Sequence, residues 1–65
     1  MINDPEITVT DALAAVDGNQ SALGRLVGVG RSSINEWKSS GREFVPVLQA
    51  YRLQRRMPEI FDDVA

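Results

Sequence analysis

The sequence predicts an all-α domain of four to five short helices. Apolar residues recur at helical spacing, as in the i, i+4, i+7 series of Val9, Leu13 and Val16. Glycine or proline separates the periodic stretches, and none of them alternates as a strand does. With 65 residues, the chain makes one domain with a thin margin of stability.

The chain is expected to begin with an arm and a first helix. Residues 1–7 hold no periodic pattern, so we expect a flexible or extended arm. Thr8 is a suitable N-cap for a first helix over about residues 9–17. Either Gly18 or Asn19 suits the left-handed residue that closes many helices.

The second and third helices are expected on either side of a glycine corner. The second begins at residue 19 or 20 and runs to about residue 27, and the third covers residues 31–39. Gly28-Val29-Gly30 between them is too short for anything but a tight turn. Gly24 lies inside the second helix, where glycine costs about 1 kcal/mol relative to alanine unless a neighbour needs the space. A close crossing by the third helix would need that space.

These two helices each have an apolar face and a polar face. The apolar faces, expected to share a core, consist of Leu23, Leu26, Val27, Ile34 and Trp37. The polar face of the third helix consists of Arg31, Ser32, Asn35 and Lys38. Side chains of all four types can hydrogen bond to base edges or phosphates.

A fourth helix is expected over about residues 46–55. Pro46 suits its first position because the fixed φ of proline is helical. Its expected apolar face consists of Val47, Leu48 and Tyr51. Pro58 ends the helical stretch and can start one more turn.

Net charge is −2, but its distribution favours a polyanionic partner. All seven basic residues lie within residues 25–56, which carry +5, whereas residues 1–24 carry −4 and residues 57–65 carry −3. The field at a binding face depends on local charge, so the basic centre can hold a polyanion. The acidic flanks either weaken non-specific affinity or point away from the partner.

Composition disfavours an enzyme or a metalloprotein. The chain has neither His nor Cys, and Ser32 and Ser33 have no activating partner nearby in sequence. Asp62 and Asp63 could bind a hard cation, but carboxylates at a chain end are usually only solvated. We expect no cofactor, no metal and no small-molecule substrate. The longest apolar run, residues 12–16, is far shorter than a membrane span, so we expect a soluble, cytoplasmic protein.

The central stretch resembles a known family of DNA-binding proteins. Residues 20–37 read Gln-x-x-Leu-Gly-x-x-x-Gly-Val-Gly-x-Ser-x-Ile-x-x-Trp, which is similar to the helix-turn-helix of phage repressor and Cro proteins. A looser likeness extends from the first helix to Tyr51. The resemblance implies a lambda-repressor-like helix-turn-helix domain over residues 8–65, of the all-helical kind, that binds DNA as a dimer. The chain departs from the family at Gly24, where alanine is usual, and in its acidic charge.

Roles follow from this resemblance and from side-chain chemistry. Carried over by position, Gln20 contacts a phosphate, Arg31 and Ser32 enter the major groove first, and Asn35 faces bases one turn on. The fork of Arg31 matches guanine O6 and N7, and the amide of Asn35 suits adenine. The full set of candidate phosphate contacts is Gln20, Ser33, Lys38, Ser40 and Arg42.

A second copy of the chain is expected at the DNA. One copy presents too small a reading face for tight binding, so we expect two copies on half-sites about one helical turn apart. The apolar residues least clearly used by the helical core are Phe44, Val45, Met57, Ile60 and Phe61. Some of them are candidate dimer contacts, and the equal alternative is that they close the core of each subunit.

The sequence therefore predicts a Cro-like transcriptional repressor. It would bind a palindromic operator in double-stranded DNA as a homodimer, through the helix over residues 31–39. The alternative is a small helical interaction module, such as an antitoxin or adaptor, whose third helix meets an acidic protein.

Overall fold

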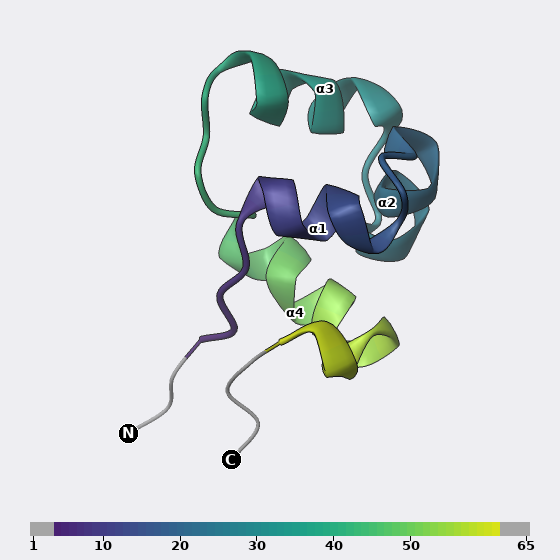
Figure 1. Cartoon of the computed structure of the whole chain (residues 1–65), viewed down its shortest axis with the longest axis vertical. Coiled ribbons are helices and arrows are strands. Elements are labelled where there is room, and N and C mark those ends of the chain that lie inside the picture. The colour runs from purple at the N-terminus through teal and green to yellow at the C-terminus, as the bar shows by residue number, and fades with distance from the viewer. Residues whose placement is uncertain (1–3, 62–65) are drawn as a thin grey trace.

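Four helices pack around one core in the computed structural model, which describes residues 4–61 (Figure 1). They are α1 (Val9–Ala15), α2 (Gln20–Val27), α3 (Arg31–Ser39) and α4 (Val47–Arg56), followed by the 3₁₀ turn η1 (Pro58–Ile60). Over this described part of the chain no strand forms, so the all-α prediction is confirmed. The longest helix has 10 residues, so none within residues 4–61 reaches the roughly 20 residues of a membrane span.

The bounds of α2 and α3 agree with the sequence, whereas α1 ends earlier than predicted. Thr8 caps α1 by accepting the backbone N–H of Asp11 at 3.0 Å. The helix stops at Ala15 because Asp17 and Gly18 take left-handed conformations, with φ of 57° and 76°. Asn19 is extended instead, and its side chain caps α2.

The core brings together side chains from every helix, from the arm before α1, from the connection between α3 and α4, and from the residue after η1. Its buried members are Ile7, Val9, Ala12, Leu23, Val27, Ile34, Trp37, Val45, Ala50, Leu53 and Phe61. The predicted shared core of α2 and α3 is therefore confirmed, with Leu26 packed at its edge.

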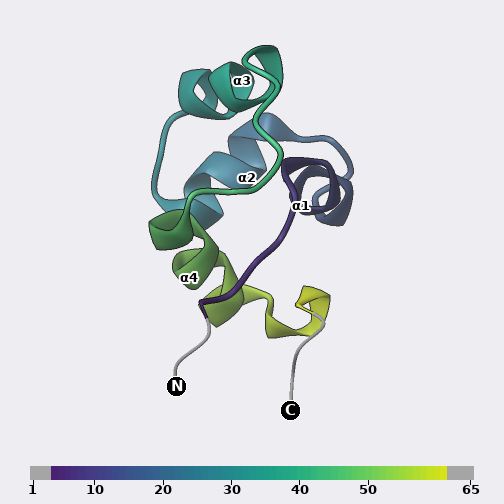
Figure 2. The same ribbon diagram turned by 90° about the vertical axis from the view of Figure 1, so that its left-hand side faces the viewer.

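Residues 4–7 form an extended arm that packs against the segment before α4. The N–H of Val45 donates to the carbonyl of Ile7 at 2.9 Å, and Ile7 itself is only 6% exposed. Figure 2 shows the arm crossing from α1 to α4. There the Tyr51 hydroxyl donates to Asp4 Oδ1 at 2.7 Å, a bond that raises the pKa of Tyr51, with burial and the carboxylate charge adding to the shift. Residues 1–3 of the predicted arm lie outside the described residues.

The predicted apolar face of α4 is wrong. Val47, Leu48 and Tyr51 are 48%, 58% and 39% exposed. The helix instead buries Ala50 and Leu53. Successive helical residues turn by 100°, which places that buried pair on the side away from Leu48. An apolar stripe is therefore left uncovered within the described chain.

The corner between α2 and α3 depends on two glycines. Gly28 ends α2 with φ of 79°, a left-handed conformation that other residues rarely adopt. Gly24 faces the backbone of the turn, because a Cβ built on it would lie 2.6 Å from the carbonyl oxygen of Val29. The space that Gly24 leaves is therefore occupied by the turn itself, whereas the sequence predicted a crossing by α3.

Replacing Gly24 with alanine is expected to lower the free energy of unfolding. Overpacking against a backbone oxygen costs about 1–3 kcal/mol, and the better helix propensity of alanine returns about 1 kcal/mol. Urea denaturation should show a net loss of up to about 2 kcal/mol. The matched control is Gly30→Ser, which has no close contact and improves the N-cap of α3, so it should cost nothing. An alanine variant more stable than the natural chain would show that the turn can move away from α2.

Candidate functional site

The outward face of α3 and the start of α2 form one open hollow. It has a volume of about 580 Å³, and its lining residues are Gly18, Asn19, Gln20, Ser21, Arg31, Ser32 and Asn35. The structure therefore brings together the three predicted base-reading residues and the predicted phosphate contact Gln20. Figure 1 shows α3 at one end of the molecule, where nothing in the described chain covers its outer side.

Because one side of α3 is buried in the core, the residues on its other side are exposed to solvent. Ile34 and Trp37 are buried against the core, which turns Arg31 and Asn35 outward. Asn35 follows Arg31 by four residues and Lys38 follows it by seven, so the three share one stripe. With a rise of 1.5 Å per residue, this stripe is about 10 Å long. A donor-rich stripe of this length suits an extended, acceptor-rich partner.

Two of the other four predicted phosphate contacts lie in a second hollow at the far end of α3. Lys38 and Arg42 line this hollow of about 840 Å³, but Asp11 and Glu43 line it as well. The two carboxylates lower the positive potential there. Arg42 also donates from Nη1 to the carbonyl of Phe44 at 3.4 Å, which leaves its other N–H groups free for a partner.

Serine hydroxyls at the end of α3 are already engaged. Ser40 Oγ donates to the carbonyl of Trp37 at 3.3 Å, and Ser39 Oγ donates to that of Asn35 at 2.9 Å. A hydroxyl has one proton to donate, so Ser40 must give up this bond to donate to a phosphate. Ser33 is half-buried on the flank of α3.

The predicted dimer contacts divide between core and surface. Val45 and Phe61 are each 4% exposed and close the core of the single chain, which is the alternative that the sequence left open. Met57 and Ile60 are half-buried against the same core. Of these five apolar residues, only Phe44 is exposed, because its neighbour Val45 takes the inward position.

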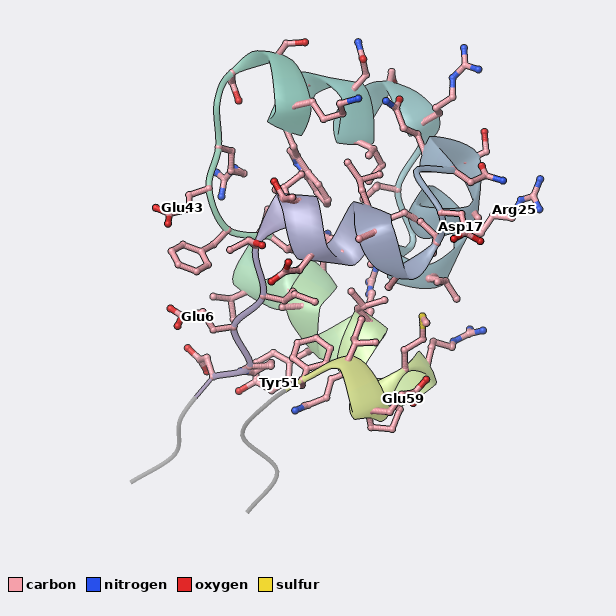
Figure 3. The ribbon with its side chains drawn as sticks, in the orientation of Figure 1. Glu6, Asp17, Arg25, Glu43, Tyr51 and Glu59 are labelled. Atoms are coloured by element: carbon pink, nitrogen blue, oxygen red, sulfur yellow. The ribbon has the colours of Figure 1, made fainter. Side chains whose placement is uncertain are left out.

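A cluster of four arginines was not anticipated from the sequence. Arg25, Arg52, Arg55 and Arg56 line a hollow of about 310 Å³ between α2 and α4, and none of the residues that line it is acidic. Arg52 Nη1 donates to the carbonyl of Val27 at 3.2 Å and so caps the C-terminus of α2. Figure 3 shows Arg25 on the side of the molecule away from Glu6 and Glu43.

Most of the basic residues within residues 25–56 lie outside the α3 stripe. Seven cations lie within residues 25–56, but only Arg31 and Lys38 belong to the stripe on α3. The helical spacing of Arg52 and Arg56 is visible in the sequence, whereas the approach of Arg25 depends on how α2 packs on α4.

Comparison with known protein families, with curated proteins and with solved structures finds no match. Within residues 4–61 no group of three or more His, Cys, Asp or Glu gathers as a metal site would, and Asp62 and Asp63 lie outside the described residues. The α3 stripe with the start of α2 combines guanidinium, ammonium, amide and hydroxyl side chains along one exposed side of a helix.

Proposed function

We propose that the chain is a sequence-specific DNA-binding protein that places α3 in the major groove. The observation that carries this proposal is the exposed stripe of Arg31, Asn35 and Lys38 on a helix whose opposite side is buried. A major groove about 12 Å wide admits one α-helix, and its base edges carry the acceptors that such a stripe can contact.

Each end of the stripe has a different role in this proposal. Arg31 reads guanine through O6 and N7, Asn35 reads adenine one turn further on, and Ser32 bonds to either. Gln20 contacts a phosphate at the start of α2, where backbone N–H groups favour an anion. Lys38 and Arg42 contact phosphates at the other end, and Ser33 and Ser40 contribute if their hydroxyls turn outward.

The arrangement of α2, the glycine corner and α3 supports a helix-turn-helix of the lambda-repressor kind. Gly28 provides the left-handed end of α2, and Gly24 lets the turn pack closely against it. The sequence pattern over residues 20–37 resembles phage repressor and Cro proteins. By that resemblance, the proposed role is a transcriptional repressor.

Two copies are expected at each operator. Of the proposed phosphate contacts only Lys38 and Arg42 are cations, and the net charge of the chain is −2, so one copy neutralises few phosphates. Two copies related by a two-fold axis double these contacts and require a palindromic site, with half-sites about one helical turn apart.

Selection from random DNA duplexes at two salt concentrations tests the proposal. The full chain should enrich a palindrome, and its binding should weaken as salt rises. The matched control is an Arg31→Ala/Asn35→Ala variant, whose substitutions are exposed and should leave the fold intact while removing the enrichment. No enriched site, together with a stable co-purifying protein, would favour the small interaction module instead.

A further inference from the structure

The outward side of α4 and the segment before it form an exposed apolar surface. Its four large apolar residues, Phe44, Val47, Leu48 and Tyr51, are all the large hydrophobics that are exposed within residues 4–61. Val47, Leu48 and Tyr51 lie on one side of α4, and Phe44 lies in the extended segment that leads into the helix. We call these four residues, together with Arg55, the α4 face. A contiguous apolar patch rimmed by charges is typical of an interaction surface.

The α4 face becomes basic toward the end of the helix. Arg55 follows Leu48 by seven residues and Tyr51 by four, so it continues the apolar stripe directly. Arg52 and Arg56 lie on its flank and are exposed. Thus three cations accompany the last two turns of α4.

The same face becomes acidic at its start. Glu43 precedes Phe44, and the packed arm brings Glu6 and Asp4 alongside, with Asp4 bonded to the Tyr51 hydroxyl. Figure 3 shows Glu43, Glu6 and Tyr51 on one side of the molecule. Arg42 is the basic residue at this end, and it donates to the carbonyl of Phe44.

We propose that the α4 face binds a second copy of this chain, with the two α4 helices antiparallel about a two-fold axis. When the helices cross between Leu48 and Tyr51, Leu48 packs against Tyr51 of the partner subunit. Arg55 then lies opposite Phe44 and Glu43 of the partner subunit. The basic end of each helix meets the acidic end of the other, whereas a parallel arrangement would place like charges together.

The second copy is favoured as occupant because the surface is self-complementary. A two-fold interface uses the same patch on both subunits, so it needs matching opposite charges at the two ends of that patch, which the α4 face has. Helix α4 lies at the other end of the molecule from α3, as Figures 1 and 2 both show, so contacts through α4 leave the α3 stripe free. This inference deepens the proposed function and rests on it in naming the dimer partner that a palindromic site requires.

The first test is the oligomeric state of the full chain without DNA. Sedimentation at increasing protein concentration should show a monomer–dimer equilibrium. Leu48→Glu should abolish the dimer over the same concentrations, because Leu48 is the most exposed apolar residue of the face. Its matched control is Ala14→Glu, an exposed position on α1, which should leave the dimer unchanged. Thermal unfolding by circular dichroism should show both variants folded.

The second test determines whether the two α4 helices are antiparallel in the dimer. Glu43→Arg and Arg55→Glu should each weaken the dimer at least about tenfold, a change of about 1.4 kcal/mol. The double reversal should restore it, because each new charge again faces its opposite across the two-fold axis. Glu59→Arg makes the same charge change as Glu43→Arg, but on η1, and should have little effect.

Each outcome decides the proposal. A chain that stays monomeric, or a dimer that survives Leu48→Glu, overturns it, and failure of the double reversal overturns the antiparallel arrangement. A dimer that enriches no DNA site would contradict the proposed function alone. A monomer that enriches a single half-site would contradict this inference and the palindromic site, but not DNA reading by α3.

Discussion

Replacing Ile34 with alanine is expected to remove a large part of the stability of the protein. Ile34 is completely buried between α3 and the core. Truncation of such a side chain costs about 2–5 kcal/mol, because transfer energy is lost and a cavity remains. A domain of this length has about 3–10 kcal/mol in total. The variant should therefore unfold at much lower urea concentration or be partly unfolded in buffer.

Urea denaturation followed by circular dichroism and by the fluorescence of the single tryptophan, Trp37, measures this loss. The matched control is the next residue, because Asn35 is exposed on the opposite side of α3. Asn35→Ala should change the free energy of unfolding by no more than about 0.5 kcal/mol. Equal losses from the two substitutions would contradict the division of α3 into a buried and an exposed side.

The helices around the corner were predictable because local signals agree there. The glycines at 28 and 30 limit where α2 can end and α3 can begin, and the apolar spacing fixes which side of each is buried. The grouping of Gln20 with Arg31 and Asn35 follows from the same signals, because a short corner leaves few ways to arrange two helices. Sequence could therefore anticipate most of the candidate site.

The side of α4 that faces the core was not predictable in this way. Its sequence offers two apolar stripes, one through Leu48 and Tyr51 and one through Ala50 and Leu53. Both stripes have helical spacing, and the first has the larger apolar side chains, so the sequence favoured burial of the first. Packing selects the second, because small Ala50 allows α4 to approach the rest of the core closely. Which stripe is buried thus depends on tertiary contacts.

Burial of the residues outside the helices also depends on tertiary contacts that the sequence does not show. Val45 and Phe61 are not part of any helical pattern, and only the pairing of Val45 with Ile7 shows why Val45 points inward. The arginine cluster likewise depends on the packing of α2 on α4. These positions had the weakest local signals, so the sequence left Val45 and Phe61 open between a dimer contact and the core of one chain.

Replacing Arg31 with alanine is expected to weaken binding to the selected operator by about 1–3 kcal/mol per half-site. The residue is exposed at the start of α3, so the fold should be retained. Loss of the guanidinium fork removes two hydrogen bonds to one guanine, and preference should relax at that base position in both half-sites. Titration of labelled operator and of base-substituted operators measures the change.

The matched control for Arg31 is Lys38, two turns further along the same stripe. Lys38→Ala removes a phosphate contact in the proposal, so it should weaken all sequences alike and reduce the salt slope by about 1. Arg31→Ala should instead change binding to random DNA much less than binding to the operator. If random DNA and operator lost affinity equally, Arg31 would contact phosphate and not a base. The two substitutions together therefore separate base reading from backbone contact along a single helix.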